Sequence, residues 1–463
     1  MTISSQNATK KKGLILSFCK EYPTVLILTL VLVLYTFFQS DFLIRNTISL
    51  ALCLYCFIKG RAQIDLWILL PLLAIPALGL LSILLNHLDF YTNYTLPFLA
   101  LPVIYCVLSY CSQKERDALC KILIVWGALI SIVSLSSYII QAQHYHAARL
   151  STIIGNPNTS GLVFAFLLLC LLTYRKKWEE IRSPLLCVEP VLITALCLTL
   201  SISSIASFGA GVIVYFFYQK ITKKSPIASM VSSYICYFFI GFTIALLLYT
   251  AANYTDAPWF CIILGFYLIA VSLFWHSLVT LINQHLLFAR IGSILSIAAL
   301  LALLILRPNA LLSFQDRLGM IADGLTYAGL NPLFGIGPLQ WYHYNTMMSD
   351  TPFNTFFIHN VFIHTVVELG LFALLCLIVL VVRYGIKQRS ALGLSLGTAF
   401  LLHSVVDTAL FIPLVPLVFM VITAQPQERS IALSDTTIRI ISALYLLCLS
   451  GIGTLYIYSL PLQ

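Results

Sequence analysis

The sequence predicts an all-α protein: a polytopic bundle of about 12–15 transmembrane helices with one large extracytoplasmic loop. Hydrophobic residues make up 60% of the 463 residues and charged residues only 9%, whereas a soluble domain carries roughly a quarter charged residues. Apolar runs of about 17 to 25 residues recur along the chain, and each is long enough to cross a hydrocarbon layer about 30 Å thick. A soluble fold is therefore excluded, and a lipid bilayer is the expected surrounding of the protein.

A basic segment, residues 1–21, precedes the first apolar run and resembles the start of a signal peptide. The run from Tyr22 to Phe38 lacks a small-residue cleavage site and a second span follows closely, so we expect a retained anchor.

Two prolines between Ala391 and Ala424 remove backbone donors, which is consistent with two short helices or with one broken, partly re-entrant helix. The fifteen predicted spans are residues 22–38, 43–58, 64–85, 95–111, 118–140, 158–174, 185–201, 205–219, 229–250, 258–281, 291–306, 359–382, 391–405, 409–424 and 436–458.

The distribution of lysine and arginine predicts that the N-terminus lies in the cytoplasm, because short cytoplasmic loops retain positive charge. Every lysine falls on the N-terminal side of the predicted spans, and the opposite side keeps only four arginines, Arg45, Arg149, Arg307 and Arg317. The net charge of +9 therefore follows from topology, and no nucleic-acid partner is expected. The chain divides into a cytoplasmic N-terminus (1–21), transmembrane helices (22–306), a large extracytoplasmic loop (307–358) and C-terminal transmembrane helices (359–463).

The large loop is predicted to be ordered. Its hydrophobic residues recur at helical spacing beside three charged residues: Phe314, Leu318, Ile321 and Leu325 with Asp316, Arg317 and Asp323. This pattern predicts an amphipathic helix, which either lies at the membrane surface or packs as a lid. A turn-rich stretch from Asn331 to Pro338 follows, in which proline ends the helix and glycine permits close approach of the backbone.

His359 is a candidate catalytic base, because it opens a long apolar helix at the extracytoplasmic face. A histidine in the first turn feels the positive end of the helix dipole, which keeps the ring neutral, as a general base requires. The same helix end attracts anions. A lone interfacial histidine is more often a cap or a packing residue, so His359 alone does not define a site.

Two pairs of polar residues share a helix face at spacing i, i+4: His364 with Glu368, and His403 with Asp407. Each pair can hydrogen-bond locally and fix its helix against neighbouring helices. Acids inside membrane spans, Glu189 among them, are rare and often functional. Structural and functional roles are therefore both open for these residues.

Several segments occur in an order that resembles one known family. They are Arg149 ahead of Gly155-Asn156-Pro157-Asn158, then Arg317, the turn from Asn331 to Gly337, the helix from His359-Asn360 to Glu368-Leu369-Gly370, and the element from His403 to Asp407. Together they span about Arg149 to Ala424. Their order and spacing are similar to those of the O-antigen ligase and polymerase superfamily of bacterial polysaccharide assembly.

The resemblance implies a glycosyltransferase of the inner membrane that works at the periplasmic face, without a metal ion or a cofactor. It would move a glycan from undecaprenyl pyrophosphate onto a sugar acceptor such as the lipid A core. His359 matches the family histidine regarded as the base that activates the acceptor hydroxyl. Arg149 and Arg317 match positions associated with the pyrophosphate of the donor. Asn360, His364 and Glu368 are candidates for supporting roles at the site.

The chemistry of such a transfer agrees with these roles. Pyrophosphate gains negative charge as the anomeric bond breaks, so fixed guanidinium groups stabilise the transition state. A single displacement without a covalent intermediate inverts the anomeric centre. The family commonly carries a further arginine in a serine-containing motif where this chain has Ile202, in the stretch Leu200-Ser201-Ile202-Ser203-Ser204. This departure either shifts the expected pyrophosphate binding to Arg149, Arg317 and Arg45, or weakens the resemblance.

Three functions other than a ligase are also consistent with parts of the sequence. A polymerase that joins lipid-linked repeat units shares the constellation, and one sequence does not reveal the acceptor. A protein O-glycosylating relative is less expected, because the chain ends just after its last predicted span. A flippase or secondary transporter of lipid-linked sugars would show internal repeats, and the hydropathy has no convincing symmetry between the halves. The ordered loop and its neighbouring histidine favour an enzyme.

Overall fold

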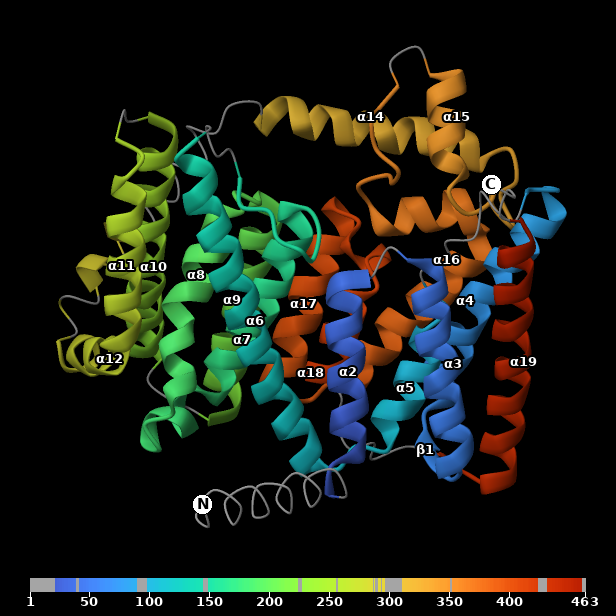
Figure 1. Cartoon of the computed structure of the whole chain (residues 1–463), viewed down its shortest axis with the longest axis horizontal. Coiled ribbons are helices and arrows are strands. Elements are labelled where there is room, and N and C mark those ends of the chain that lie inside the picture. The colour runs from blue at the N-terminus through green and yellow to red at the C-terminus, as the bar shows by residue number, and fades with distance from the viewer. Residues whose placement is uncertain are drawn as a thin grey trace, which may run out of the picture.

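Most helices of the protein run side by side in a bundle, and one helix of the large loop lies across an end of it (Figure 1). The computed structural model describes residues 21–38, 41–89, 98–144, 149–223, 227–254, 257–285, 287, 290–292, 294–295, 310–349, 352–423 and 431–459. We call the end on which the large loop lies the loop end. The opposite end is the lysine end, because α3 and α16 finish there at Lys59 and Lys387.

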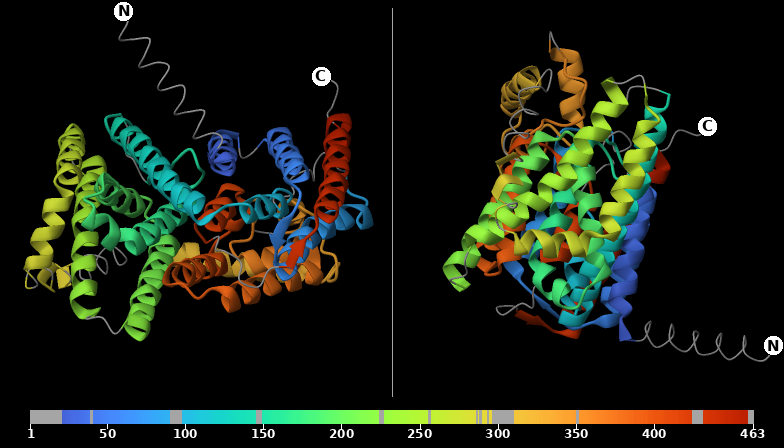
Figure 2. Two further views of the ribbon diagram at one scale, coloured as in Figure 1. Left: turned by 90° about the horizontal axis from the view of Figure 1, so that it is seen from below. Right: turned by 90° about the vertical axis from the view of Figure 1, so that its left-hand side faces the viewer.

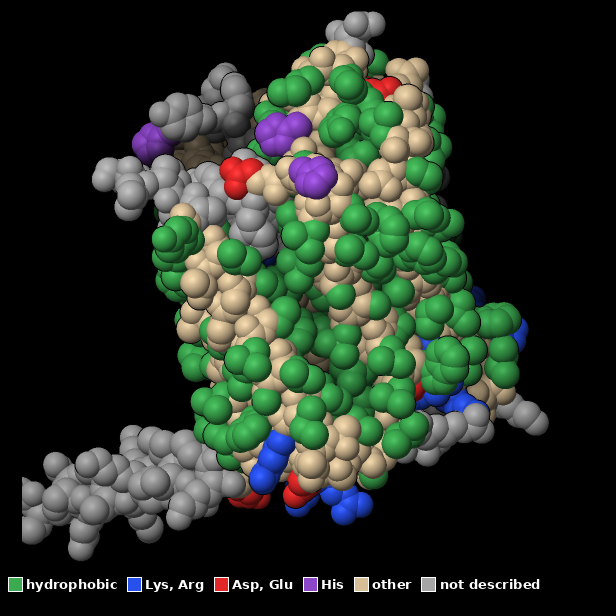
Figure 3. Space-filling model, turned by 90° about the vertical axis from the view of Figure 1, so that its right-hand side faces the viewer, with side chains coloured by type: hydrophobic (Ala, Val, Ile, Leu, Met, Phe, Trp, Pro, Cys, Tyr) green, Lys and Arg blue, Asp and Glu red, His purple; other side chains and the backbone are tan. Residues whose placement is uncertain are grey.

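Eight helices in the described ranges are long and apolar enough to cross a membrane. These are α3 (Phe42–Lys59), α4 (Leu66–Leu85), α6 (Gln113–Ala142), α7 (Pro157–Glu180), α9 (Ile202–Lys223), α10 (Ile227–Tyr254), α16 (Val361–Lys387) and α19 (Asp435–Ser459). The predicted fold class, an all-α multi-pass helical bundle, is therefore confirmed. Hydrophobic side chains cover the middle of the molecule, and lysine and arginine gather at the lysine end (Figure 3).

The other helices of the described residues are shorter or, as for α14, less apolar. They are α2 (Pro23–Phe38), α5 (Leu101–Ser109), η1 (Pro184–Val188) with α8 (Glu189–Leu198), α11 (Phe260–Leu273), α12 (Trp275–Gln284), α14 (Ala310–Ala328), α15 (Gln340–Met348), α17 (Ala391–Val406), η2 (Ala409–Phe411) and α18 (Leu414–Thr423). The open choice for residues 391–424 is resolved as two short helices, α17 and α18, separated by η2.

The prediction of continuous spans is wrong in two places. The described part of the predicted span 95–111, residues 98–111, forms α5, whose nine residues rise about 14 Å, less than half of a hydrocarbon layer. Residues 258–281 yield α11 and α12, which meet at an angle of 66°. Each segment is apolar enough for a span, but hydropathy does not report where a helix bends or ends. The predicted span 291–306 lies largely outside the described residues.

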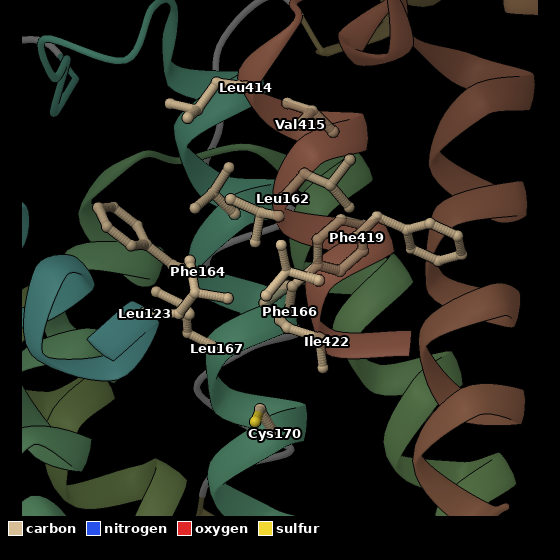
Figure 4. Packing of buried hydrophobic residues seen from close by; sticks show 14 of the residues in the cluster. Leu123, Leu162, Phe164, Phe166, Leu167, Cys170, Leu414, Val415, Phe419 and Ile422 are labelled. Carbon is tan, nitrogen blue, oxygen red and sulfur yellow. The ribbon is translucent and has the colours of Figure 1, made fainter. Parts of the chain in front are cut away.

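Helix α7 is the centre of the core. Every residue from Thr159 to Leu172 is buried, as expected of a helix that is apolar on all sides. Figure 4 shows Leu162 and Phe166 beside Phe419 of α18. At the loop end of α7, a side chain at Gly161 would collide with Ser204 of α9, so this small residue lets the two helices approach closely.

A buried charge cluster joins α7 to its neighbours at the lysine end. The Arg175 guanidinium donates to Glu179 Oε1 and to Glu189 Oε1, each at 2.7 Å. Trp275 Nε1 donates to the second oxygen of Glu189 at 2.9 Å. The guanidinium also lies 4.0 Å from the centre of the Tyr237 ring. This lysine-end cluster ties α7, α8, α10 and α12 together, so Glu189 has a structural role.

A small sheet also closes the lysine end. Strand β1 (Ala62–Ile64) pairs antiparallel with β2 (Ile431–Leu433), in the register Ala62 to Leu433. Asp65 follows β1, and its carboxylate accepts from Arg383 at 2.9 Å and pairs with Lys387. Segments far apart in the sequence are thereby fixed to one another at this end.

The large loop contains the predicted helix, now seen as α14, and a second short helix, α15 (Figure 2). One face of α14 packs against the loop and α16 through Met320 and Tyr327. Three of the four residues of the predicted apolar stripe face outward, since Phe314, Leu318 and Leu325 are 54%, 51% and 53% exposed. The fourth, Ile321, is partly buried and packs with Met320 and Tyr327. The helix therefore packs like a lid on one face and leaves an apolar stripe free, as expected at a membrane surface.

The turn after α14 is seated on a break in α16. Gly370 interrupts α16 with φ of 81°, and Gly335 in the turn has φ of 73°. A Cβ atom on Gly335 would lie 2.3 Å from the Glu368 backbone, so only glycine fits this approach. The N–H groups of Ile336 and Gly337 donate to the Val367 and Glu368 carbonyls at 2.9 and 3.0 Å. These bonds hold the large loop on the bundle.

Candidate functional site

The start of α16 differs from the prediction for His359. The helix begins at Val361, and Asn360 is its N-cap, since its Oδ1 accepts from the Ile363 N–H at 3.0 Å. His359 therefore precedes the cap and is not in the first helical turn. The capping amide explains the difference, because asparagine is a strong N-cap and histidine is not. Asn360 Nδ2 also donates to the Val405 carbonyl at 2.9 Å, which joins the start of α16 to the end of α17.

Asp407 lies at this junction and is the centre of the site. It follows the last residue of α17 and is fully buried. His359 Nδ1 lies 3.4 Å from Asp407 Oδ1, and Arg317 Nη2 lies 3.6 Å from Asp407 Oδ2. The Thr408 N–H donates to Oδ1 at 2.8 Å. Two residues predicted for the site, from α14 and from the segment before α16, thus meet on one carboxylate.

Burial by itself raises the pKa of Asp407, but the contacts with His359, His403 and the Thr408 N–H lower it further than burial raises it. The net result is a pKa well below the ordinary value, so the carboxyl group is ionised at neutral pH. An ionised carboxylate is the partner that a histidine base needs on one ring nitrogen.

Arg149 reaches the same carboxylate through Asn158. Arg149 Nη2 donates to Asn158 Oδ1 at 2.8 Å, and Asn158 Nδ2 donates to Asp407 Oδ2 at 2.6 Å. Arg149 Nε is held by the Thr199 carbonyl at the end of α8, at 2.8 Å. Asn158 stands in the first turn of α7, where the Asn156 cap and Pro157 begin that helix. We call Arg149, Asn158, Arg317, His359 and Asp407 the loop-end cluster.

A serine of α9 completes the surroundings of this cluster. Ser204 Oγ donates to the Asn158 carbonyl at 2.9 Å and lies 3.3 Å from His403 Nε2. The His403 ring therefore contacts α9, and its expected pairing with Asp407 takes the form of a charge interaction that helps to lower the pKa of Asp407. Ile202, which stands where an arginine was expected, is in the first turn of α9, close in sequence to Ser204.

His364 and Glu368 form the predicted pair, with His364 Nε2 at 3.3 Å from Glu368 Oε2. The same carboxylate accepts from the Leu339 and Trp341 N–H groups at 2.9 and 3.2 Å. Leu339 directly precedes α15 and Trp341 is in its first turn, so Glu368 acts as a distant cap for that helix. His364 is buried against the Phe411 ring, with 4.7 Å between ring centres. Both residues hold the large loop in position.

Arg45 lies elsewhere in the bundle. It is buried on α3, which packs mainly against α19 and α5. The contacts that join Arg149 to Arg317 pass through Asn158 and Asp407 and not through Arg45. The structure thus brings together two of the three predicted arginines with His359.

The loop-end cluster combines two chemical capacities. A carboxylate beside His359 Nδ1 favours the tautomer that carries its proton there, which leaves Nε2 to accept a proton from a substrate. Two guanidinium groups face one carboxylate, so the cluster carries excess positive charge for an anionic group. The side chains of Arg317 and His359 are 24% and 22% exposed. In the described ranges, no three His, Cys, Asp or Glu side chains gather as a metal site.

Sequence reasoning missed Asp407, Asn158 and Ser204 as members of the site. The sequence predicts Asp407 as a local partner of His403 and Asn158 as part of a turn motif; both belong to segments that carry the resemblance, but neither is predicted as a site residue. An acid that follows an apolar segment, far from any lysine, was a usable signal for Asp407. For Ser204 the sequence holds no signal beyond the neighbouring serines.

No protein-family model matches the sequence, and none of the curated proteins compared with it matches.

Proposed function

We propose that the protein is a membrane glycosyltransferase that transfers a glycan from undecaprenyl pyrophosphate to a sugar hydroxyl, in the manner of an O-antigen ligase. The observation that carries this proposal is the contact of His359 with Asp407 beside Arg149 and Arg317 at the loop end. A general base and two anion-binding groups in one cluster fit a transfer in which a hydroxyl is activated and a pyrophosphate leaves.

His359 is the general base in this proposal. Its Nε2 takes the proton of the acceptor hydroxyl while the hydroxyl oxygen attacks the anomeric carbon of the donor. Asp407 holds the ring through Nδ1 and stabilises the imidazolium that forms, as the acid of a catalytic triad does. Asn158 and the Thr408 N–H keep the carboxylate in place.

Arg149 and Arg317 bind the leaving group. The bond between the anomeric carbon and the phosphate oxygen breaks as the new bond forms, and its electron pair stays on undecaprenyl pyrophosphate. Guanidinium groups fixed on the protein stabilise this charge without reorganising in the transition state. Attack and departure on opposite faces of the sugar ring invert the anomeric centre.

The outward stripe of α14 suits a lipid-linked donor. Phe314, Leu318 and Leu325 are each about half exposed, and Arg317 of the same helix reaches Asp407. A helix whose apolar stripe rests at the headgroup level holds Arg317 near the depth at which the phosphates of a lipid carrier lie. Carrier and base then meet at the loop end.

Purified protein in liposomes tests the proposal directly. With an undecaprenyl-pyrophosphate-linked glycan as donor and lipid A core as acceptor, we expect a glycosylated core of inverted anomeric configuration, detected by mass spectrometry and NMR. Absence of transfer by folded protein, with this acceptor and with a second donor molecule as acceptor, would count against both a ligase and a polymerase.

Deletion of the gene in its host separates the remaining functions through a gel of the surface polysaccharide. Loss of a ligase leaves bare core with polymer accumulated on the carrier. Loss of a polymerase, the alternative function, leaves core with one repeat unit. Loss of a lipid-linked sugar transporter leaves no exported units.

Orientation is part of the proposal, because the site must face the periplasm. A cysteine introduced at Tyr342 in the large loop should react with an impermeant thiol reagent in intact cells, whereas one at Lys177 should not. Both positions are accessible in the fold, since Lys177 is exposed and Tyr342 is partly exposed. The reverse labelling pattern would place the loop-end cluster in the cytoplasm and exclude the proposed reaction.

A further inference from the structure

A cavity lies between α4, α5, α6, α16, α17 and α18, away from the loop-end cluster. Its volume is about 430 Å³, within the range of about 300–1,000 Å³ that small-molecule sites occupy. Along α16 it extends from Leu377 to Lys387, which corresponds to about 15 Å of helix rise. The cavity is therefore long enough for an extended hydrocarbon chain.

The chemistry of the cavity changes along its length. Most of the lining towards the loop end is apolar, and Leu72, Leu101 and Leu410 belong to it. The basic lining residues all stand on segments that belong to the lysine end: Arg116, Arg383, Lys387 and Arg389. An apolar chamber with a cationic end fits an amphiphile whose head is anionic.

One acid, Asp65, neutralises part of this positive charge. It pairs with Arg383 and Lys387, which leaves Arg116 and Arg389 outside any ion pair among the described residues. Glu115, the sequence neighbour of Arg116, is engaged by the Ser112 N–H and hydroxyl at 2.8 and 3.0 Å. The lysine end of the cavity thus keeps excess positive charge.

Arg116 is the residue that points to a ligand. It is only 7% exposed, and its Nε donates to the Cys111 carbonyl at 3.1 Å. Its Nη1 is buried and has no hydrogen-bond partner in the described part of the protein. A buried guanidinium nitrogen without an acceptor is costly, so an acceptor supplied by a bound molecule would relieve a real penalty.

We propose that this cavity binds one anionic phospholipid, with an acyl chain between α5, α16 and α18 and the phosphate on Arg116 and Arg389. Basic residues at a membrane face attract anionic headgroups, and arginine accepts phosphate through a pair of hydrogen bonds. A zwitterionic lipid offers the same chain without the net charge. The site is separate from the proposed glycosyl transfer and does not depend on it.

Native mass spectrometry of the full-length protein in detergent tests the site with two probes, dioleoylphosphatidylglycerol and dioleoylphosphatidylcholine. We expect one molecule of the glycerol lipid to bind about tenfold or more tightly than the choline lipid. Arg116→Gln should remove most of that preference, which corresponds to one hydrogen bond to a charged group. Lys114→Gln is the matched control, since Lys114 is an exposed cation in the same helical turn.

A second variant covers the case in which Arg116→Gln does not fold. Leu380→Trp places bulk in the apolar part of the cavity and should weaken binding of both lipids at least fivefold. Equal affinity of the wild type for the two lipids would overturn the proposal, as would unchanged binding in both variants. Preferential retention of added undecaprenyl phosphate over the glycerol lipid would assign the cavity to a polyprenyl carrier and overturn the phospholipid.

Discussion

The two ends of the bundle each place arginine beside a buried carboxylate, but they balance the charges in opposite ways. In the lysine-end cluster one arginine, Arg175, meets two carboxylates, Glu179 and Glu189. In the loop-end cluster two arginines share one carboxylate, directly from Arg317 and through Asn158 from Arg149. The first cluster carries excess negative charge and the second excess positive charge when histidine is neutral.

Exposure of the arginines differs as well, although each cluster holds one buried carboxylate and Glu179 at the lysine end is 28% exposed. The Arg175 and Glu189 side chains are 10% and 1% exposed, whereas those of Arg317 and His359 are 24% and 22% exposed. A buried pair that is matched within the protein mainly specifies how helices fit together, and its contribution to stability is small or negative. A cluster that is open and unbalanced can still bind an anion. Burial of charge alone therefore does not mark a functional site, but imbalance with access does.

The largest effect is expected from His359→Gln. Glutamine keeps part of the hydrogen bonding but cannot accept a proton, so transfer in the reconstituted assay should fall about a hundredfold or more. Protein level and melting temperature should stay near those of the wild type, because His359 precedes the helix cap and packs loosely. His343→Gln, an exposed histidine of the same loop, should retain activity. Near-normal turnover by His359→Gln would show that the base lies elsewhere.

Asp407→Asn should have the next largest effect. The amide removes the negative charge that orients His359 and pairs with Arg317, and it leaves the buried site with uncompensated positive charge. We expect transfer to fall by about tenfold to a hundredfold, less than for His359, because an orienting acid contributes less than the base that it serves. Asp316→Asn, an exposed acid beside Arg317, is the control. Equal activities of the two variants would separate Asp407 from the reaction.

A smaller loss is expected for Arg149→Lys and Arg317→Lys. Lysine keeps the charge but loses the planar fork, so each variant should reduce transfer about tenfold. Both should raise the apparent KM for the lipid-linked donor more than that for the acceptor. Arg61→Lys, at an exposed position of the lysine end, should change neither value. If both loop-end variants matched this control, pyrophosphate binding would belong to other residues.

The fold was largely predictable because hydropathy and the lysine and arginine distribution report directly on membrane spans. The amphipathic helix of the large loop was predictable from the helical spacing of its hydrophobic residues. Where spans break was not predictable, because a bend such as that between α11 and α12 depends on packing against other helices. The cap at Asn360 shifted His359 out of its helix, and sequence boundaries are uncertain by a few residues.

The site was predictable only in part. Arg149, Arg317 and His359 stood out by position and by resemblance, but nothing in the sequence says that they converge on Asp407. That convergence depends on tertiary contacts between residues as distant as Asn158 and Asp407, 249 positions apart. The spacing i, i+4 favoured a local partner for Asp407 and hid its distant ones. Glu368 was similarly judged from its own helix, although its main role is to cap α15.

The smallest effect on transfer is expected from Glu189→Gln, which tests the comparison of the two ends at the lysine-end cluster. Glutamine preserves the size of the side chain and an oxygen for Trp275 Nε1, but it removes one of the two carboxylates on Arg175. Removing a partner from a buried pair typically costs about 3–5 kcal/mol, and the low end applies because Glu179 still neutralises Arg175. The melting temperature should therefore fall, while transfer per folded molecule stays within about twofold of the wild type. Glu180→Gln, an exposed acid beside Glu179, should change neither property. A large loss of transfer by Glu189→Gln at an unchanged melting temperature would mean that the lysine-end cluster takes part in the reaction, and that charge balance does not distinguish the two ends.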